Sequence, residues 1–401
     1  MPFDRSSCAD APITATGRGT RRTVLATLLA AALPLLAHAQ SAQPTIGVIL
    51  SATGPVASLG ILEKNGVMLA ADKSKAGFKY IHLDDASDPT QAARVARKLI
   101  DEDHVDAIIG TTGTPGALAL SPVAAEGKTL VISQAPGNVL VEPVEGDKRW
   151  IFKTTTNDDH EGRPLFDHMK ANGVKTLGFI GFSDSYGDQW LKMSQGMTQA
   201  AGIQLVGEER YARTDTSVAS QVLKITSKSP DAVVVAGSGG AAATPVLELR
   251  KRGYQGKIYV TLGATFGDFL RILGNDAEGL YAPFAAVMGV SQLPDGNPGK
   301  AGAQQFVQAY EEKFGAGTAN IFSAGGWDAV KLIEQAAPVA AKSGKPGTPE
   351  YRAALRDAME TIKNLSGARG VYNLSPTNHV GLDSHALMVG RFTKGKWVLQ
   401  P

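Results

Sequence analysis

The chain has 401 residues, of which 43% are hydrophobic and 19% charged, and its formal net charge is +2. This is the composition of ordinary globular material, and the length suffices for about two to three domains of roughly 150 residues each. A single Cys excludes a disulfide framework, and the near-neutral charge gives no basis for binding nucleic acid or an anionic membrane.

Residues 1–39 have the pattern of a secretory signal peptide. Arginines precede the apolar run Val24–Ala37, which is too short to span a bilayer comfortably and ends in the small-x-small cleavage pattern Ala37–Ala39. The pair Arg21 and Arg22 leaves twin-arginine export open beside the Sec route. No Cys follows the apolar run, so we expect a periplasmic protein without a lipid anchor.

Cleavage after residue 39 would remove Cys8 and leave no thiol for a disulfide, a metal or a nucleophile. The removed segment holds four Arg and two Asp, so 36 basic and 36 acidic side chains remain and the mature net charge is zero. No later stretch is long and apolar enough for a transmembrane helix.

Strands and helices alternate from residue 45 onward. The expected strands of a first unit are Thr45–Leu50, Phe78–Leu83, Asp106–Ile109, Leu130–Ser133 and Trp150–Lys153. Helices are expected at Gly60–Lys75, at Thr90–Glu102 and from Pro115. This alternation predicts a parallel sheet with helices on both faces, in which ligands bind beyond the carboxyl ends of the strands. The loops at these ends are Ser51–Leu59, Thr111–Thr114 and Ala135–Gly137.

A second α/β unit of similar size begins near Asn157. Its expected strands are Thr176–Gly181, Gln204–Glu208, Asp231–Ala236, Lys257–Val260 and Gly279–Pro283. Its expected helices are Asp188–Ala201, Ser217–Ser227, Thr244–Arg252 and Asp268–Leu273. The tail adds helices at Gly299–Phe314, Ala324–Lys342 and Pro349–Ile362, then short strands at Gly370–Leu374, Ala386–Phe392 and Trp397–Leu399. These last strands could complete the second sheet.

Several polar clusters are candidate binding sites. The Gly/Thr loop before Pro115 can direct unpaired N–H groups at an anion, or it can be a capped turn without a ligand. Asp84, Asp85 and Asp88 fit a helix cap with Pro89 better than a metal site. The polar stretch Asp158–Glu161 is likewise interpreted as a helix start.

No motif indicates an enzyme or a cofactor. Gly237–Ala242 resembles a dinucleotide fingerprint, but no acid follows the next strand to hold a ribose. His379, Asp383 and His385 share a loop and could ligate a metal, although loop histidines near a chain end are more often solvated. We therefore expect no cofactor, no metal and no catalysis, and two lobes with a ligand-binding cleft between them.

Four short motifs stand in order along the chain, namely Val48–Ala57, Leu83–Pro89, Ile109–Thr112 and Asp184–Gly187. In this order they resemble the periplasmic leucine/isoleucine/valine-binding family of ABC-transporter solute-binding proteins. The resemblance implies a type I periplasmic binding fold: two doubly wound parallel-sheet lobes joined by a hinge of three crossings. It further implies a monomer that closes around a small solute and delivers it to a membrane permease.

The resemblance also implies a division of the chain. Lobe 1 would comprise residues 43–154 and 285–366, and lobe 2 residues 155–284 and 367–401. The crossings would lie near Thr154–Thr156, Ala282–Ala285 and Ser366–Gly370.

The family's ligand positions can be carried over one at a time. Its carboxylate-binding hydroxyl falls on Thr114, with Thr112 nearby, and its backbone donors fall on Ala135 and Gly137. The apolar part of the ligand would meet Leu59, Tyr186, Phe266 and Phe322, and the small residues around Ser238 would make room for a flat ring.

The segment Thr261–Phe266 lacks the acid that amino-acid binders of this family place there. A buried ammonium without a carboxylate partner is strongly penalised. The chain also looks like the branch that takes aromatic acids, so the expected ligand is a benzoate-type carboxylate without an α-amino group. A branched-chain or other amino acid remains the alternative ligand, and a ligand-sensing receptor domain remains the alternative role.

Overall fold

The computed structural model describes residues 43–383 and 386–400 and contains two main sheets. The first sheet has the strand order β2-β1-β3-β4-β5, and every neighbouring pair is parallel. Its strands are β1 (Thr45–Leu50), β2 (Lys79–Asp84), β3 (Ala107–Gly110), β4 (Leu130–Ser133) and β5 (Ile151–Lys153). Strands β3, β4 and β5 are buried throughout, as expected of strands covered on both faces, and they are apolar except for Ser133 and Lys153 at their ends.

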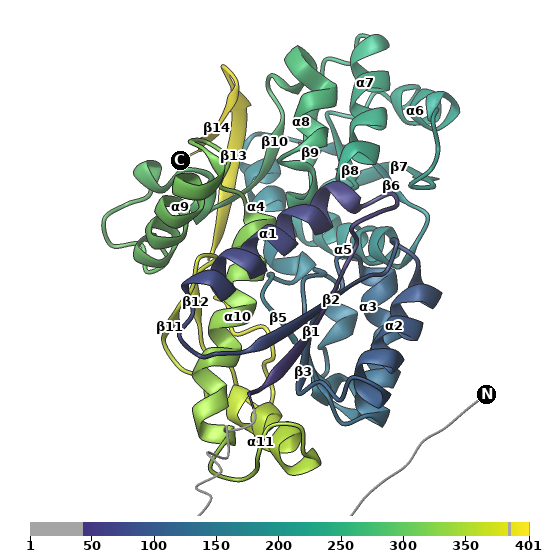
Figure 1. Cartoon of the computed structure of the whole chain (residues 1–401). Helices are drawn as coiled ribbons and strands as arrows, with labels where there is room; N and C mark the ends of the chain where they lie inside the picture. Colours follow the sequence, from purple (N-terminus) through teal and green to yellow (C-terminus); the bar gives the residue numbers. More distant parts are fainter. Residues whose placement is uncertain (1–42, 384–385, 401) are drawn as a thin grey trace, which may run out of the picture. The chain divides into compact units, whose positions relative to one another are not determined.

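Helices from distant parts of the chain cover this sheet. They are α1 (Ala57–Lys73), α2 (Pro89–Asp101), α3 (Thr114–Glu126), α10 (Ile321–Ala340) and α11 (Pro349–Met359). Figure 1 shows α1 beside α10 on one side of the strands, with α2 and α3 on the other. Helices α1 and α10 approach closely because each has a glycine at the contact, Gly66 and Gly326. A Cβ on Gly326 would lie 2.2 Å from the carbonyl oxygen of Glu63. This contact fixes the turn of α1 that carries Glu63.

The second sheet has the order β14-β13-β10-β9-β8-β6-β7. Its strands are β6 (Thr176–Phe182), β7 (Gln204–Tyr211), β8 (Ala232–Ala236), β9 (Lys257–Val260), β10 (Tyr281–Ala285), β13 (Leu387–Thr393) and β14 (Lys396–Leu399). Strands β6 to β10 pair in parallel, whereas β13 is antiparallel to β10 and β14 is antiparallel to β13. The sheet is therefore mixed at one edge, where the C-terminal strands complete it.

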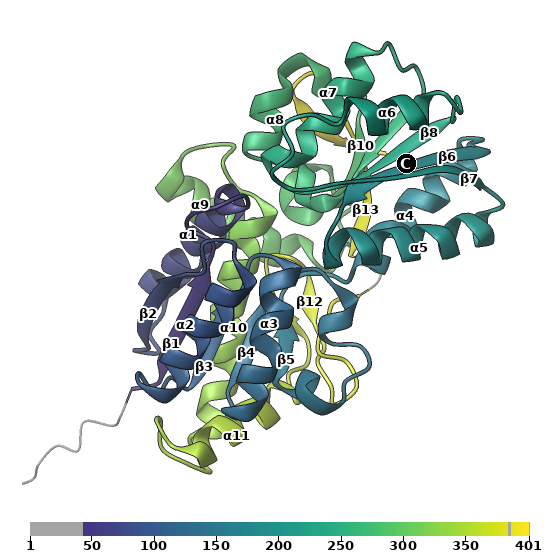
Figure 2. The same cartoon turned by 90° about the vertical axis from the view of Figure 1, so that its right-hand side faces the viewer.

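Five helices cover the second sheet, and Figure 2 shows α4 and α5 on one face and α6, α7 and α8 on the other. Their bounds are α4 (Asp158–Ala171), α5 (Ser185–Ala201), α6 (Ala219–Thr226), α7 (Ala243–Lys251) and α8 (Asp268–Leu273). Helix α9 (Lys300–Phe314) packs Phe306 against Trp327 of α10, and β11 (Leu365–Ser366) pairs with β12 (Val371–Tyr372).

The predicted α/β architecture is confirmed, and most differences lie at element ends. One expected strand has another place: Gly370–Leu374 contains β12, which pairs with β11 and is not part of the second sheet. Helix α10 begins at Ile321, three residues before the predicted start, because the Asn320 side chain caps it by accepting from the N–H groups of Phe322 and Ser323. The predicted cap at Asp88 is present: its carboxylate accepts from Gln91 N at 2.7 Å, with Pro89 in the first turn.

After the last predicted crossing, near Ser366–Gly370, the chain does not leave the first sheet at once. Tyr372 donates its hydroxyl to Thr154 O and to Asp328, and His379 contacts β5 through Ile151 O. The chain that we expected to enter lobe 2 at residue 367 thus still contacts elements around the first sheet at residue 379. The division into lobes otherwise stays a prediction.

The expected signal peptide lies outside the described residues, as does His385 of the suggested metal cluster. Within the described part of the chain, no group of three His, Cys, Asp or Glu side chains is arranged to hold a metal ion. No helix among the same residues is long and apolar enough to cross a membrane.

Candidate functional site

A cavity lies where loops from the carboxyl ends of both sheets come together. It is lined by Val56, Leu59, Glu63, Thr112, Gly113, Thr114, Gln134, Pro136, Thr155, Glu161, Tyr186, Arg213, Ser238, Leu262, Gly263, Ile321, Phe322 and Arg369. This is the location expected for a ligand site in parallel α/β sheets.

Most of the predicted site residues meet in this cavity. Those that line it are Leu59, Thr112, Thr114, Tyr186, Ser238 and Phe322. Ala135, Gly137 and Phe266 are not among the lining residues, although Gln134, Pro136 and Leu262 beside them are. The predicted loops therefore border one cavity, and its lining also includes two arginines and two glutamates that were not predicted.

Two of the predicted carboxylate donors are already engaged. The Thr112 hydroxyl donates to Glu63 Oε2 at 2.6 Å and accepts from Ser51 N at 3.1 Å. The Ala135 N–H donates to its neighbour Ser133 Oγ at 3.1 Å. In this structure neither group has a donor left for a ligand, which corrects the role that we expected of them.

Other donors beside the cavity have no partner. The Thr114 hydroxyl and the Gln134 side-chain amide nitrogen are buried without a hydrogen bond to any described residue. The Gly137 N–H likewise donates to no described residue, and a Cβ on Gly137 would lie only 2.8 Å from Thr114 Cγ2. Because buried polar groups are normally satisfied, unpartnered donors in one place indicate a ligand that supplies acceptors.

Glu63 of α1 and Glu161 of α4 bring two carboxyl groups to the cavity. Burial raises the pKa of Glu63 to about 8, against the opposing effect of the Thr112 hydroxyl. Burial also raises the pKa of Glu161 to about 8, and the nearby Asp158 adds to the effect. Near neutral pH both side chains are therefore mainly uncharged acids.

The helix start predicted at Asp158–Glu161 is confirmed as the first turn of α4, but two of its acids also have buried contacts that the prediction left out. Glu161 is 2% exposed and accepts from Leu262 N at 3.2 Å, and Asp158 accepts from the Trp190 indole at 2.8 Å. Glu161 thus supplies a carboxyl to the very segment whose sequence lacks an acid. A helical pattern alone could not reveal that these acids point inward.

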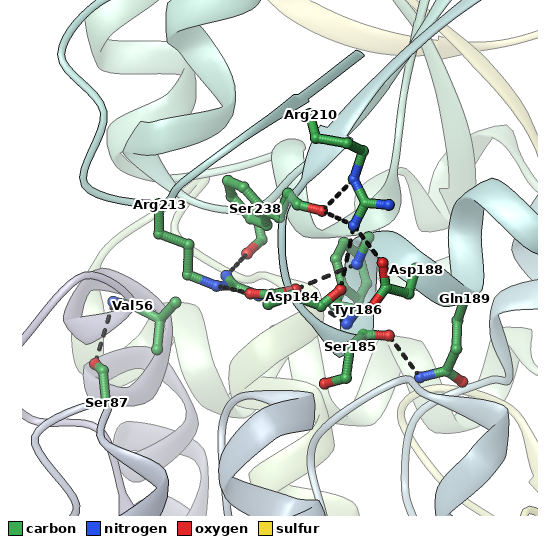
Figure 3. Close-up of polar contacts among 12 residues, drawn as sticks. Val56, Ser87, Asp184, Ser185, Tyr186, Asp188, Gln189, Arg210, Arg213 and Ser238 are labelled. Carbon is green, nitrogen blue, oxygen red and sulfur yellow. Dashed lines mark hydrogen bonds and ion pairs between the residues drawn. The ribbon is translucent and has the colours of Figure 1, made fainter. Parts of the chain in front are cut away.

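Arg213 extends from the end of β7 over the cavity and is held by the second sheet. Its Nε donates to Asp184 at 2.6 Å and its Nη1 to Ser238 Oγ at 3.0 Å, as Figure 3 shows. Its guanidinium also stacks over the Phe182 ring at 4.0 Å, with Tyr186 beside it. Asp184 therefore compensates the charge of Arg213.

Arg369 is the second cation of the cavity, and its guanidinium donates to neutral acceptors. It is 7% exposed, and its guanidinium donates to Ile321 O and Thr155 Oγ1, both at 2.9 Å. Arg369 forms no direct ion pair with a described carboxylate, although its charge acts on Glu63 and Glu161 of the same cavity. A buried cation bonded only to neutral acceptors attracts an anion. No sequence motif marked Arg369, because its partners come from distant segments.

Two α/β units whose strand ends line one cavity define a ligand-binding protein of the type I periplasmic binding fold. The chain belongs to the periplasmic binding protein family, whose model matches residues 43–396.

Solved structures and curated relatives agree with this assignment. An extracellular ligand-binding receptor from Rhodopseudomonas palustris HaA2 is 38% identical, with a TM-score of 0.85 over 90% of this chain and 100% of that one. A Leu/Ile/Val-binding protein homolog from Brucella melitensis is 24% identical over 90% of this chain and 95% of its own length. A solute-binding protein of an ABC transporter from R. palustris, solved in complex with benzoate, is 21% identical with a TM-score of 0.75, over 89% of this chain and 95% of that one.

Proposed function

We propose that the chain is the exported solute-binding subunit of an ABC importer and that its ligand is a small carboxylate without an α-amino group. An aromatic acid of the benzoate type fits best, and the protein delivers it to the permease without chemical change. Membership in a family of periplasmic binding proteins supports the exported location and the binding role.

The observation that carries this proposal is the set of unsatisfied positive and donor groups around one cavity. The Thr114 hydroxyl and the Gln134 amide nitrogen have no partner among the described residues, and the Arg369 guanidinium donates to neutral acceptors. With Glu63 and Glu161 mainly protonated, Arg369 leaves the cavity positive at neutral pH. A carboxylate would satisfy the donors and neutralise the charge.

The apolar part of the lining supports an aromatic body for this carboxylate. Leu59 and Phe322 approach from the first sheet's helices and Tyr186 from α5, while Ser238 and Gly263 are small. A flat ring could occupy the space between them. Phe266 is half-buried and packs against the core instead of lining the cavity, so it is dropped from the proposed contacts.

An amino acid is the second candidate, because Glu63 and Glu161 could ionise to bind an ammonium. With a pKa of about 8, ionising one of them at pH 7 costs about 1.4 kcal/mol. The names of the curated relatives agree with this candidate. The benzoate complex shows a likeness of fold alone at 21% identity and does not decide between the two.

A thermal-shift screen with aromatic acids, amino acids and short aliphatic acids tests the proposal, since a bound ligand raises the melting temperature. We expect benzoate or 4-hydroxybenzoate to stabilise the wild type and to stabilise Thr114→Val much less. Gly196→Ala, on the exposed side of α5 with open space around it, is the matched control. Stabilisation by leucine and by no aromatic acid would overturn the proposal.

A further inference from the structure

Lys153 is a fully buried lysine behind the loop that follows β4. It ends β5, it is 0% exposed, and each of its three ammonium protons has an acceptor. These acceptors are Pro136 O, Gly137 O at 3.3 Å and Asn157 Oδ1 at 2.6 Å. Two of them are carbonyls of the loop whose other side faces the cavity.

The charge of Lys153 is not cancelled by a direct ion pair with any described carboxylate. The acids that act on it stand further away: Asp158, Glu142, Glu161 and Asp159. Glu142 reaches it only through Asn157, whose amide donates to Glu142 Oε1. Burial lowers the pKa of Lys153 to about 8. Burying a charge on neutral acceptors costs free energy of folding, so a lysine with no role beyond packing is not expected at this position.

The Pro136 carbonyl, one of the two that Lys153 binds, belongs to the same peptide group as the Gly137 N–H. In a trans peptide these two groups point in opposite directions, and the 136–137 bond is trans. The Gly137 N–H therefore points away from the ammonium. Gly137 itself lies close to Thr114, because a Cβ on Gly137 would lie 2.8 Å from Thr114 Cγ2. Thr114 lines the cavity, and its hydroxyl has no partner among the described residues. An ammonium on the carbonyl side makes the N–H on the other side a stronger donor.

We propose that Lys153 is a positioning residue for the ligand carboxylate: through the Pro136–Gly137 peptide it orients the Gly137 N–H and strengthens it as a donor. Its positive charge also favours an anion over a neutral ligand at this side of the cavity. The inference rests on the proposed function only in that the ligand carries a carboxylate.

The test compares acids with their neutral amides by calorimetry at pH 7, using benzoate with benzamide and leucine with leucinamide. In Lys153→Met we expect affinity for the acid to fall about tenfold more than affinity for its amide. Lys170→Met, which removes an exposed lysine of α4, is the matched control and should leave the ratio unchanged. Equal losses for acid and amide would show a packing role alone and overturn the proposal.

Glu142→Gln supplies a test in the opposite direction that leaves the lysine in place. Glutamine keeps an oxygen for the Asn157 amide and removes a negative charge near Lys153. Because Glu142 also helps to keep Lys153 protonated, this variant is compared with wild type at pH 6, below the lysine pKa, where the acid-to-amide ratio should rise about twofold. An unchanged ratio counts against the proposal even if Lys153→Met does not fold. If the wild type binds leucine, and the acid-to-amide ratios change in the variants as expected, only the proposed function is overturned. If the wild type binds no carboxylate, the proposed function and the role of Lys153 are both overturned.

Discussion

Raising the pH from 7 to 9 should weaken binding of an anionic ligand, because two buried acids of the cavity lose their protons in this range. Burial raises the pKa of Glu63 and of Glu161 to about 8 in each case. At pH 7 both are mainly neutral and the Arg369 charge attracts the ligand. At pH 9 both are mainly ionised and oppose a carboxylate.

The size of the effect follows from the two pKa values. If the bound state keeps both acids protonated, each must take up a proton at pH 9, one unit above its pKa, at a cost of about 1.4 kcal/mol. Affinity should therefore fall by up to about tenfold for each glutamate, or about a hundredfold for both. The arginines keep their charge throughout this range.

Calorimetric titration with benzoate at pH 6, 7, 8 and 9 measures this dependence. The variant Glu63→Gln/Glu161→Gln should lose most of it, because glutamine preserves the acceptors for Thr112 and Leu262 without a titrating proton. Lys153 also loses its charge near pH 8, so some decrease should remain in the variant. A wild-type affinity that is constant from pH 6 to 9, or an equal decrease in the variant, would refute the reasoning.

Further predictions concern stability and binding. Folding raises the pKa of Glu161 from 4.5 to about 8, so the protein's free energy of unfolding falls as the pH rises between these values. In urea denaturation, Glu161→Gln should therefore be more stable than wild type by roughly 3–5 kcal/mol at pH 8 and similar to wild type at pH 4.5. Arg369→Met should lower benzoate affinity at least about a hundredfold by calorimetry, and an unchanged affinity would exclude it as the counter-ion. Gly137→Ala should lower the free energy of unfolding by about 1–3 kcal/mol, because its Cβ would crowd Thr114. Gly196→Ala in α5 should raise it by up to about 1 kcal/mol, because the site is open and alanine favours a helix. Denaturant melts that give the reverse order would contradict this packing.

The fold could be predicted largely from the sequence, because the signals for it are local. Apolar runs such as Ala107–Gly110 and turn residues such as Asp88-Pro89 are contiguous in the chain, and the structure confirms both the strand and the cap. Three C-terminal strands were predicted as a possible completion of the second sheet, and the last two, β13 and β14, occupy that place, whereas β12 pairs with β11 outside it. Their antiparallel direction depends on where the chain returns, which no local pattern specifies.

The site could be predicted only in part, because its charges come from segments that are remote from one another. The resemblance led to the loops that carry Thr114 and Tyr186, and both line the cavity. Arg369 is held beside the cavity by hydrogen bonds to Thr155 and Ile321, which lie far from it in sequence. Glu161 has the sequence context of a helix start, and only the packing of α4 turns it inward. Whether a polar side chain is buried depends on tertiary contacts.

Calorimetry of the mature chain at pH 7 with benzoate and with leucine tests the central claim most directly. A positive cavity with protonated Glu63 and Glu161 should bind benzoate with micromolar or tighter affinity and leucine not at all. Leucine binding in the micromolar range, with release of a proton and no heat from benzoate, would contradict the account.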